Sequence, residues 1–279
     1  MILYIETSTQ VCSAGLSHDG KWLALREDRS RDYSHSALLT VFMEEVLKEA
    51  GIEAGDVDAV AVSRGPGSYT GLRIGVSAAK GFCFGLDIPL IAVDTLKALT
   101  ASLIGPDPGT TPSGSGATAQ DPGTTTSGSG ATAPDPGATP SGSVASSESP
   151  KKPALTGGPD VLYCPMIDAR RMEVYYALFT PGLKEVRPTA AEVITADTFG
   201  ELLEKQRIVF FGDGAEKCRQ LIDSPNALFF PDILPSVRGM LQLAEEQYRR
   251  KDFVDVAYFE PYYLKDFVAG KPKVKGLYS

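Results

Sequence analysis

Histidine is scarce in this chain, which has two among its 279 residues, His18 and His35. A metal site on a helix typically needs two histidines four residues apart, but Leu39 stands four residues after His35. A Ser-His-Asp triad needs a histidine base with an orienting partner, and the sequence identifies none. The sequence therefore predicts no metal site and no catalytic residue, and we expect His35 to begin a helix or to join an interface.

The chain also lacks paired cysteines, long apolar runs and a leader-like start. Its four cysteines are scattered without a C-x-x-C pair, which indicates neither a zinc site nor a disulfide framework and is typical of a reducing cytoplasm. No apolar run is long enough to cross a bilayer, and residues 1–6 lack the basic region and cleavage site of a signal peptide. We expect a cytoplasmic protein with no membrane partner.

Positive charge is in deficit, because 27 Lys and Arg residues stand against 35 Asp and Glu, for a formal net charge of −8. Phosphate contacts dominate affinity for nucleic acids, so we expect the chain to reach them only through a basic partner. Two local exceptions are the pair Arg170-Arg171 and a tail containing Lys265, Lys271, Lys273 and Lys275. Either these cations contact phosphate or a partner, or they are merely solvated, and the sequence leaves both interpretations open.

A repeat of 14 residues divides the chain, because residues 107–120 recur almost unchanged at 121–134 and a truncated third copy begins at Asp135. The copies contain no large apolar side chain, so they have nothing to bury against the entropy of ordering. We predict a flexible, disordered low-complexity insert at 104–160. It separates a first lobe at 1–103 from a second, degenerate lobe at 161–279.

The first lobe has the element order of a ribonuclease-H-like fold, with three meander strands followed by alternating helices and strands. Asp19-Gly20 is a strong hairpin signal, and Ser34 can cap a helix that ends at Gly51. Period-2 and period-3.6 patterns predict strands at 2–6, 11–17, 22–27, 57–62 and 89–93, and helices at 35–50, after the glycine loop to about 85, and from 94 or 95.

The second lobe repeats this theme loosely. The patterns predict strands at 161–167, 174–179 and 208–211, and helices at 198–205, from 214 to about 222, and at 235–250. We expect the last helix to pack back on the first lobe. Two such lobes place the chain among α/β proteins of the actin-like ATPase superfamily, by element order alone.

A glycine loop follows the strand at 57–62 and opens a helix. Glycines allow a sharp turn and a close approach, and the first turn of a helix presents unpaired N–H groups. This geometry suits an anion or a partner helix, although a plain strand–helix turn has the same pattern. The candidate residues of the loop are Gly65, Gly67, Ser68, Tyr69, Thr70 and Arg73.

Four motifs in the two ordered parts resemble the bacterial TsaB (YeaZ) family. They are Ile5-Glu6-Thr7-Ser8-Thr9, the loop 65–75 with Ala78-Ala79-Lys80-Gly81, Asp168-Ala169-Arg170-Arg171-Met172-Glu173-Val174-Tyr175, and Pro261-Tyr262-Tyr263-Leu264-Lys265. The repeat insert has no counterpart in the family pattern, and Glu6 stands where that pattern usually has aspartate.

The resemblance implies a non-catalytic scaffold for the transfer of a threonylcarbamoyl group to the adenosine beside the tRNA anticodon. It implies a heterodimer with a homologue of the catalytic subunit TsaD, a TsaE homologue as ATPase partner, a homodimer when alone, and contact with tRNA only through the complex. The alternative is a self-sufficient ATPase, kinase or metallopeptidase-like enzyme of the same superfamily.

Actin-like ATPases hold a magnesium-bound nucleotide with an acid at the end of the first strand, which is the place of Glu6. Four residues are therefore candidates for vestigial nucleotide contacts, namely Glu6, Thr7, Ser8 and Asp213. A strand-end acid satisfied by nearby N–H groups and an ordinary turn at Asp213 explain the same residues. We expect no cofactor, except ATP or ADP at an interface with TsaD.

Small side chains recur every four residues after the glycine loop and let a second helix approach closely. With the resemblance, we expect a two-helix interface for homodimer and heterodimer that buries about 1,200–2,000 Å². We expect Ala79→Arg to block dimerisation while the fold stays intact. The candidate residues are His35, Leu38, Leu39, Phe42, Val46, Gly71, Leu72, Gly75, Val76, Ala79 and Cys83.

Overall fold

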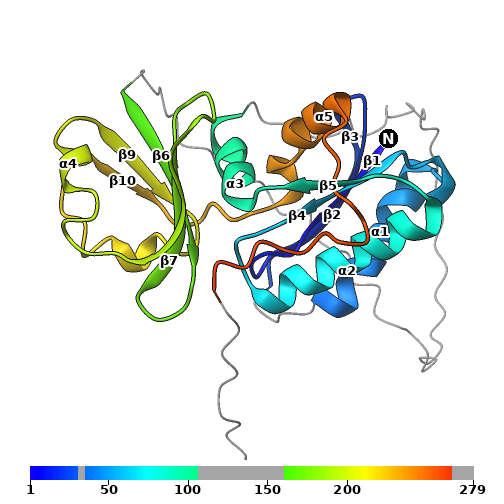
Figure 1. The fold of residues 1–279 in the computed structure, drawn as a ribbon, viewed down its shortest axis with the longest axis horizontal. Coiled ribbons are helices and arrows are strands. Elements are labelled where there is room, and N and C mark those ends of the chain that lie inside the picture. Colours follow the sequence, from blue (N-terminus) through cyan, green and yellow to red (C-terminus); the bar gives the residue numbers. More distant parts are fainter. Residues whose placement is uncertain (31–34, 106–159, 266–279) are drawn as a thin grey trace, which may run out of the picture.

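The computed structural model describes residues 1–30, 35–105 and 160–265. Most of the predicted insert at 104–160, the expected cap Ser34, and the tail lysines Lys271, Lys273 and Lys275 lie outside these residues. The described residues form two α/β lobes, each built on a five-stranded sheet (Figure 1).

The first lobe has the predicted order of three meander strands and alternating helices and strands. Its sheet runs β3-β2-β1-β4-β5, with β1 antiparallel to β2 and parallel to β4. Asp19 and Gly20 both have positive φ, as the predicted hairpin turn requires. The strands are β1 (Ile2–Glu6), β2 (Cys12–His18), β3 (Lys21–Asp28), β4 (Ala59–Ser63) and β5 (Leu90–Val93).

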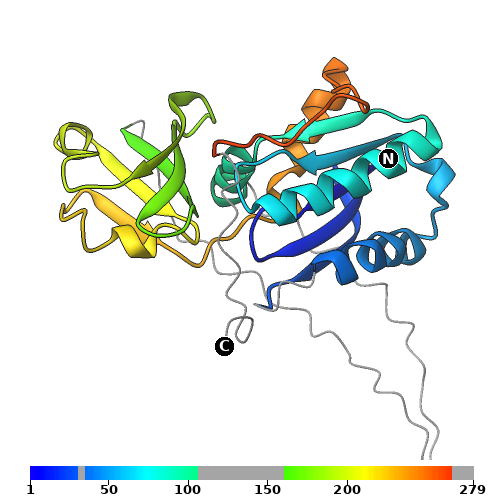
Figure 2. The same ribbon diagram turned by 60° about the horizontal axis from the view of Figure 1, so that its bottom comes forward.

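Alternate residues of β1 explain how this sheet is covered on both faces. Leu3 and Ile5 pack in one cluster with the helices α1 (His35–Ala50) and α2 (Tyr69–Leu86). Ile2 and Tyr4 point to the other face, where α5 (Leu241–Arg250) packs. Figure 2 shows α1 and α2 side by side on their face of the sheet. The C-terminal helix therefore belongs to the core of the first lobe.

The second sheet repeats the topology of the first, in the order β8-β7-β6-β9-β10. Its first two pairs are antiparallel and its last two are parallel, as in the first lobe. The fold class, two lobes of actin-like and ribonuclease-H type, is confirmed. The strands are β6 (Val161–Asp168), β7 (Glu173–Phe179), β8 (Glu185–Val193), β9 (Arg207–Phe211) and β10 (Ala227–Phe230).

Helix α3 (Thr95–Ile104) lies between the lobes (Figure 1). Leu96, Leu99 and Leu103 pack against the second sheet, while Ala98 belongs to the cluster of the first lobe. A Cβ at Gly239 would lie 2.1 Å from the carbonyl oxygen of Ala98, so a glycine is needed where the chain passes this helix. The lobes are therefore joined by packing as well as by sequence.

Three predicted helices of the second part are shorter than expected. The helix at 198–205 reduces to α4 (Gly200–Leu203), and the segment before Ile222 contains only a 3₁₀ turn, η2 (Glu216–Cys218). The last helix begins at Leu241 and not at Pro235, after a separate 3₁₀ turn, η3 (Val237–Gly239). Ser236 caps that turn, because its Oγ accepts from the Arg238 N–H at 3.4 Å.

Candidate functional site

The glycine loop at 64–68 turns the chain from β4 into α2. Ser68 caps the helix, because its Oγ accepts from the Gly71 N–H at 3.3 Å. Gly65 has a φ of 104° and donates its N–H to Thr95 Oγ1 at 3.1 Å, while its carbonyl oxygen accepts from the Thr95 N–H. The loop is thus fixed on one side by the start of α3.

The other side of the loop contacts the chain just after β1. The Ser68 N–H donates to the Ser8 carbonyl oxygen at 2.6 Å, and a Cβ at Gly67 would lie 2.3 Å from that oxygen. A Cβ at Gly71 would lie 2.0 Å from the Thr7 carbonyl oxygen. These glycines therefore permit a close approach to the chain's own segment after β1. Neither an anion nor a partner helix is needed to explain Gly67 and Gly71.

Glu6 ends β1 and is fully buried. Its Oε1 accepts from the Ser8 N–H at 2.6 Å and from Ser63 Oγ at 2.9 Å, while Oε2 has no hydrogen-bond partner among the described residues. Burial raises the pKa of the Glu6 carboxyl, although the hydrogen bonds from Ser8 and Ser63 lower it. Thr7 Oγ1 donates to the Gly71 carbonyl oxygen at 2.8 Å. These three predicted nucleotide contacts are bonded to their own chain.

Asp213 occupies a matching loop of the second lobe. Its Oδ1 accepts from the Asp168 N–H at 3.0 Å, and Gly212, at a φ of 102°, passes the Met166 carbonyl oxygen so closely that a Cβ would lie 2.2 Å from it. Burial raises the pKa of Asp213 from 3.8 to about 6. Asp213 thus holds the end of β6, while Ser68 holds the segment just after β1.

The small-residue stripe of α2 is buried within the chain. Ala79 and Cys83 are 0% and 1% exposed, and a Cβ at Gly75 would lie 2.2 Å from Thr7 Oγ1. The stripe packs on the sheet and is not the surface that a partner helix approaches. The expectation that Ala79→Arg leaves the fold intact is therefore wrong, because the new side chain would enter the core.

Most of the other expected interface residues also belong to the core of the first lobe. Leu39, Phe42, Val46, Leu72 and Val76 are buried, whereas Leu38 is half-buried. His35 is buried at the start of α1. The interface itself stays a prediction, but it has to use other side chains of the two helices.

Exposed apolar side chains do stand on the outer surface of α1 and α2. Phe84 is 85% exposed near the end of α2, and Val41 is 44% exposed on α1. Tyr258 is also 85% exposed; Lys80 Nζ donates to the carbonyl oxygens of Ala257 and Phe259, which fixes that segment beside α2. Helical periodicity places Phe84 off the buried stripe, so an apolar residue on the polar side of α2 could have been recognised in the sequence.

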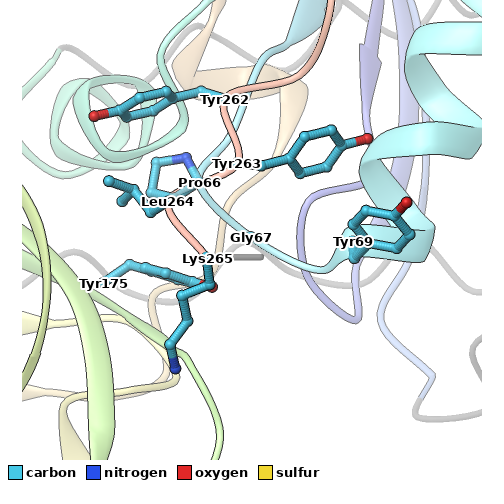
Figure 3. Close-up of a pocket in the computed structure, with 8 residues that line it drawn as sticks. All are labelled: Pro66, Gly67, Tyr69, Tyr175, Tyr262, Tyr263, Leu264 and Lys265. Carbon is cyan, nitrogen blue, oxygen red and sulfur yellow. The ribbon is translucent and has the colours of Figure 1, made fainter. Parts of the chain in front are cut away.

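A ring of tyrosines surrounds a small cavity of about 30 Å³ beside the glycine loop (Figure 3). The rings of Tyr69 and Tyr263 lie 4.9 Å apart, and the Arg73 guanidinium lies over Tyr69 and donates to its hydroxyl at 3.0 Å. The cavity has room for a water molecule but is too small for a nucleotide. The residues lining it are Pro66, Gly67, Tyr69, Tyr175, Tyr262, Tyr263, Leu264 and Lys265.

Arg170 and Arg171 lie in the turn between β6 and β7 and are exposed. Both have positive φ, 67° and 51°. Lys265, from the C-terminal segment, donates to the Ala169 carbonyl oxygen and pairs with Glu173, so this turn adjoins the tyrosine cavity. These cations stand in separate motifs of the sequence, which contains no signal that they meet the tyrosines.

Neither histidine lies in a cluster of metal-ligating side chains. Within residues 1–30, 35–105 and 160–265, no three His, Cys, Asp or Glu residues are placed so that they could hold a metal ion. His18 is exposed and lies 3.5 Å from Asp19. Over the same ranges, no helix combines the length and apolarity that crossing a membrane requires.

Comparisons with known proteins point to one pathway. The model of the family "TsaD: tRNA N6-adenosine threonylcarbamoyltransferase" matches residues 30–120. The tRNA threonylcarbamoyladenosine biosynthesis protein TsaB of Haemophilus influenzae is 37% identical over 98 residues, 35% of this chain and 41% of that protein. A tRNA N6-adenosine threonylcarbamoyltransferase of Bacillus thuringiensis is 52% identical over 108 residues, 33% of this chain and 32% of that protein. The chain thus spans less than half the length of these relatives.

The similarity of fold covers far more of the chain. The crystal structure of an uncharacterized Pseudomonas aeruginosa protein with similarity to peptidase YEAZ matches with a TM-score of 0.68 at 22% identity, over 95% of this chain and 99% of that one. Fold and loops together define a two-lobed actin-like protein whose first strand–loop junction is closed by its own backbone. The chain thus resembles TsaB proteins in part of its sequence and a YeaZ-like protein in its fold, in agreement with the sequence motifs.

Proposed function

We propose that this chain is the non-catalytic partner of a TsaD-type transferase in the synthesis of threonylcarbamoyladenosine on tRNA. The observation that carries the proposal is the exposure of apolar side chains on α1 and α2, with Phe84 85% exposed and Val41 44% exposed. Contiguous exposed apolar surface marks sites of protein association, and Phe84 and Val41 would belong to one such surface. The relative from Haemophilus influenzae, a tRNA threonylcarbamoyladenosine biosynthesis protein, supports the same assignment.

The closed junction after β1 supports a non-catalytic role. The carboxyl of Glu6 and the hydroxyl of Thr7 are bonded within the chain and buried, so they are withdrawn from a magnesium-bound phosphate. A nucleotide of this complex would then be ATP or ADP at the contact with the TsaD homologue. A TsaE homologue would join the same assembly, and tRNA would be bound by the assembly rather than by this chain alone.

Homodimer and heterodimer would use the same surface and therefore compete. An isologous dimer buries the same patch on both copies, so a partner that binds this patch more tightly displaces one copy by mass action. The experiment is light scattering on a size-exclusion column, with the chain alone and with the TsaD homologue of the same organism. We expect a dimer that converts to a mixed complex.

The variant Phe84→Glu tests the surface directly. A carboxylate at this exposed position leaves the core of α2 untouched but opposes burial in an interface, so we expect both complexes to be lost. Val193→Glu is the matched control, because Val193 is 54% exposed on β8 of the second lobe. A Phe84→Glu protein that still binds the TsaD homologue with unchanged affinity contradicts the proposal.

A further inference from the structure

The turn between β6 and β7 holds two arginines in a backbone conformation that suits other residues better. Arg170 and Arg171 have φ values of 67° and 51°, a region that glycine and asparagine adopt most readily. Side chains of this size at positive φ store strain, and such strain concentrates at functional sites. Stability alone would favour other residues here.

Two lysines from later segments of the chain hold this turn. Lys217 Nζ donates to the carbonyl oxygens of Arg171 and Glu173 at 3.1 and 2.6 Å, and pairs with Asp168 at 2.5 Å. Lys265 donates to the Ala169 carbonyl oxygen and pairs with Glu173, as described above. The nearby carboxylates are thereby matched by lysines.

The two guanidinium groups remain uncompensated. Neither Arg170 nor Arg171 forms a side-chain hydrogen bond or ion pair with any residue that the structure describes. Burial raises the pKa of Tyr175, and the positive charge of Arg170 acts on it in the opposite direction. The Arg170 guanidinium is therefore near a tyrosine that lines the cavity. In a chain of net charge −8, this is a local surface of the opposite sign.

Aromatic rings with arginines over them continue this surface on the first lobe. Tyr262 and Tyr263 are 40% and 37% exposed. The Arg64 guanidinium lies 5.8 Å from the centre of the Tyr262 ring, and the Arg73 guanidinium lies 5.4 Å from that of Tyr69. Because the cavity between the rings has room only for water, a ligand would stack on the exposed parts of Tyr262 and Tyr263.

We propose that Arg170, Arg171 and the tyrosines Tyr262 and Tyr263 form a binding surface for unpaired RNA. The two guanidinium groups would neutralise neighbouring phosphates, and bases would stack on the tyrosine faces, which is how sequence-tolerant single-strand sites work. An acidic peptide offers negative charge but no base to stack, so the exposed rings favour RNA. The proposal rests on the proposed function only for the source of the RNA.

The test is fluorescence anisotropy with a labelled single-stranded RNA that cannot pair with itself, measured over a range of salt concentrations. The protein is the full chain mixed with the TsaD homologue, because the assembly is expected to bind tRNA, and the full chain alone is measured for comparison. We expect Arg170→Asn/Arg171→Gly to bind roughly tenfold more weakly, and the slope of log affinity against log salt to flatten by ~1.4 for two lost phosphate contacts. The unfolding midpoint of this variant should not fall, because asparagine and glycine suit positive φ.

Matched variants separate this site from charge alone. Arg249→Ala/Arg250→Ala removes two cations near the end of α5 and should bind as the unmodified chain does. Tyr263→Ala should weaken binding about tenfold, whereas Tyr263→Phe should keep it, because stacking needs the ring. The same RNA annealed to its complement should bind more weakly than the single strand.

Several results would overturn the proposal. The first is no RNA binding by the chain alone or by its mixture with the TsaD homologue, and the second is an equal loss of affinity with the two double-arginine variants. The third is displacement of the RNA by poly-glutamate, an acidic peptide, that is equally effective with the unmodified and the Tyr263→Ala proteins. Absence of RNA binding by the unmodified protein, while its complex with the TsaD homologue still forms, rejects this surface and leaves the proposed function standing. RNA binding by the unmodified protein without a complex with the TsaD homologue rejects the proposed function and leaves this surface standing.

Discussion

Carboxyl groups bind the strand ends of both lobes. Glu6 accepts two hydrogen bonds at the end of β1, and Asp213 accepts the Asp168 N–H at the end of β6. Burial raises the pKa of both groups, because a charge is poorly solvated there. Each group therefore favours its neutral form in the folded chain more than in the unfolded one.

This shift makes stability depend on pH through Asp213. Its pKa is about 6 in the fold against 3.8 as the ordinary value, so the folded chain holds more protons between these pH values. The contribution is fully present below about pH 3.8 and is lost as pH rises through 6. Asp213→Asn keeps an oxygen acceptor without the charge, so its unfolding free energy should depend less on pH in this window.

Urea unfolding at several pH values between 4 and 6 measures that slope, with the exposed Asp232→Asn as the control. Asp168 and Lys217 lie near Asp213, and their charges act on its pKa in opposite directions. An Asp213→Asn protein with the slope of the unmodified chain would show that this carboxyl does not bind the extra proton.

Two glycines of α2 carry opposite consequences within one element. A Cβ at Gly75 would lie 2.2 Å from Thr7 Oγ1, whereas a Cβ at Gly81, which is exposed, meets nothing within 4 Å. Gly75→Ala should therefore destabilise the fold by about 1–3 kcal/mol through overpacking. Gly81→Ala should stabilise it by about 0.5–1 kcal/mol, because alanine favours a helix interior.

Urea unfolding of the two variants gives the signs directly. Equal effects from both substitutions would mean that the contact between α2 and Thr7 does not constrain position 75. The pair thus tests whether the small-residue stripe is a packing device of this lobe.

Strong periodicity made α1 and α2 predictable from the sequence, whereas two strands were missed. β8 (Glu185–Val193) is an edge strand with Pro188 and several exposed residues, so its alternation is weak. β10 (Ala227–Phe230) has four half-buried residues and no alternation to recognise. The stripe of small residues on α2 was recognised in the sequence. Small residues at a spacing of four suit packing on a sheet as well as on a partner helix, so only the packing of the structure shows that the stripe faces the sheet.

At the scale of the whole molecule, the same arrangement of strands and loop occurs once in each lobe. The parallel pairs β1–β4 and β6–β9 each lead into a glycine-containing loop that returns to the end of the central strand. The motifs at 168–175 and 261–265 were recognised as patterns, but their meeting beside the glycine loop depends on α3 and the C-terminal segment bringing the lobes together. Such long-range contacts leave no local signal in a sequence.

The closed junctions also predict how the molecule responds to nucleotide. A ligand that binds the folded state stabilises it by RT ln(1 + [L]/Kd), about 2.7 kcal/mol at a hundredfold excess over Kd. Because Glu6 and Thr7 are buried and bonded within the chain, Mg-ATP should leave the melting temperature of the isolated chain unchanged and should not be hydrolysed above background. With the TsaD homologue present, Mg-ATP should raise the melting temperature of the mixture.

Thermal melts and phosphate release measure both effects, with Glu6→Gln as the matched variant. A rise in the melting temperature of the isolated chain that Glu6→Gln abolishes would instead support the self-sufficient ATPase, because the buried carboxyl would then have opened to bind the nucleotide.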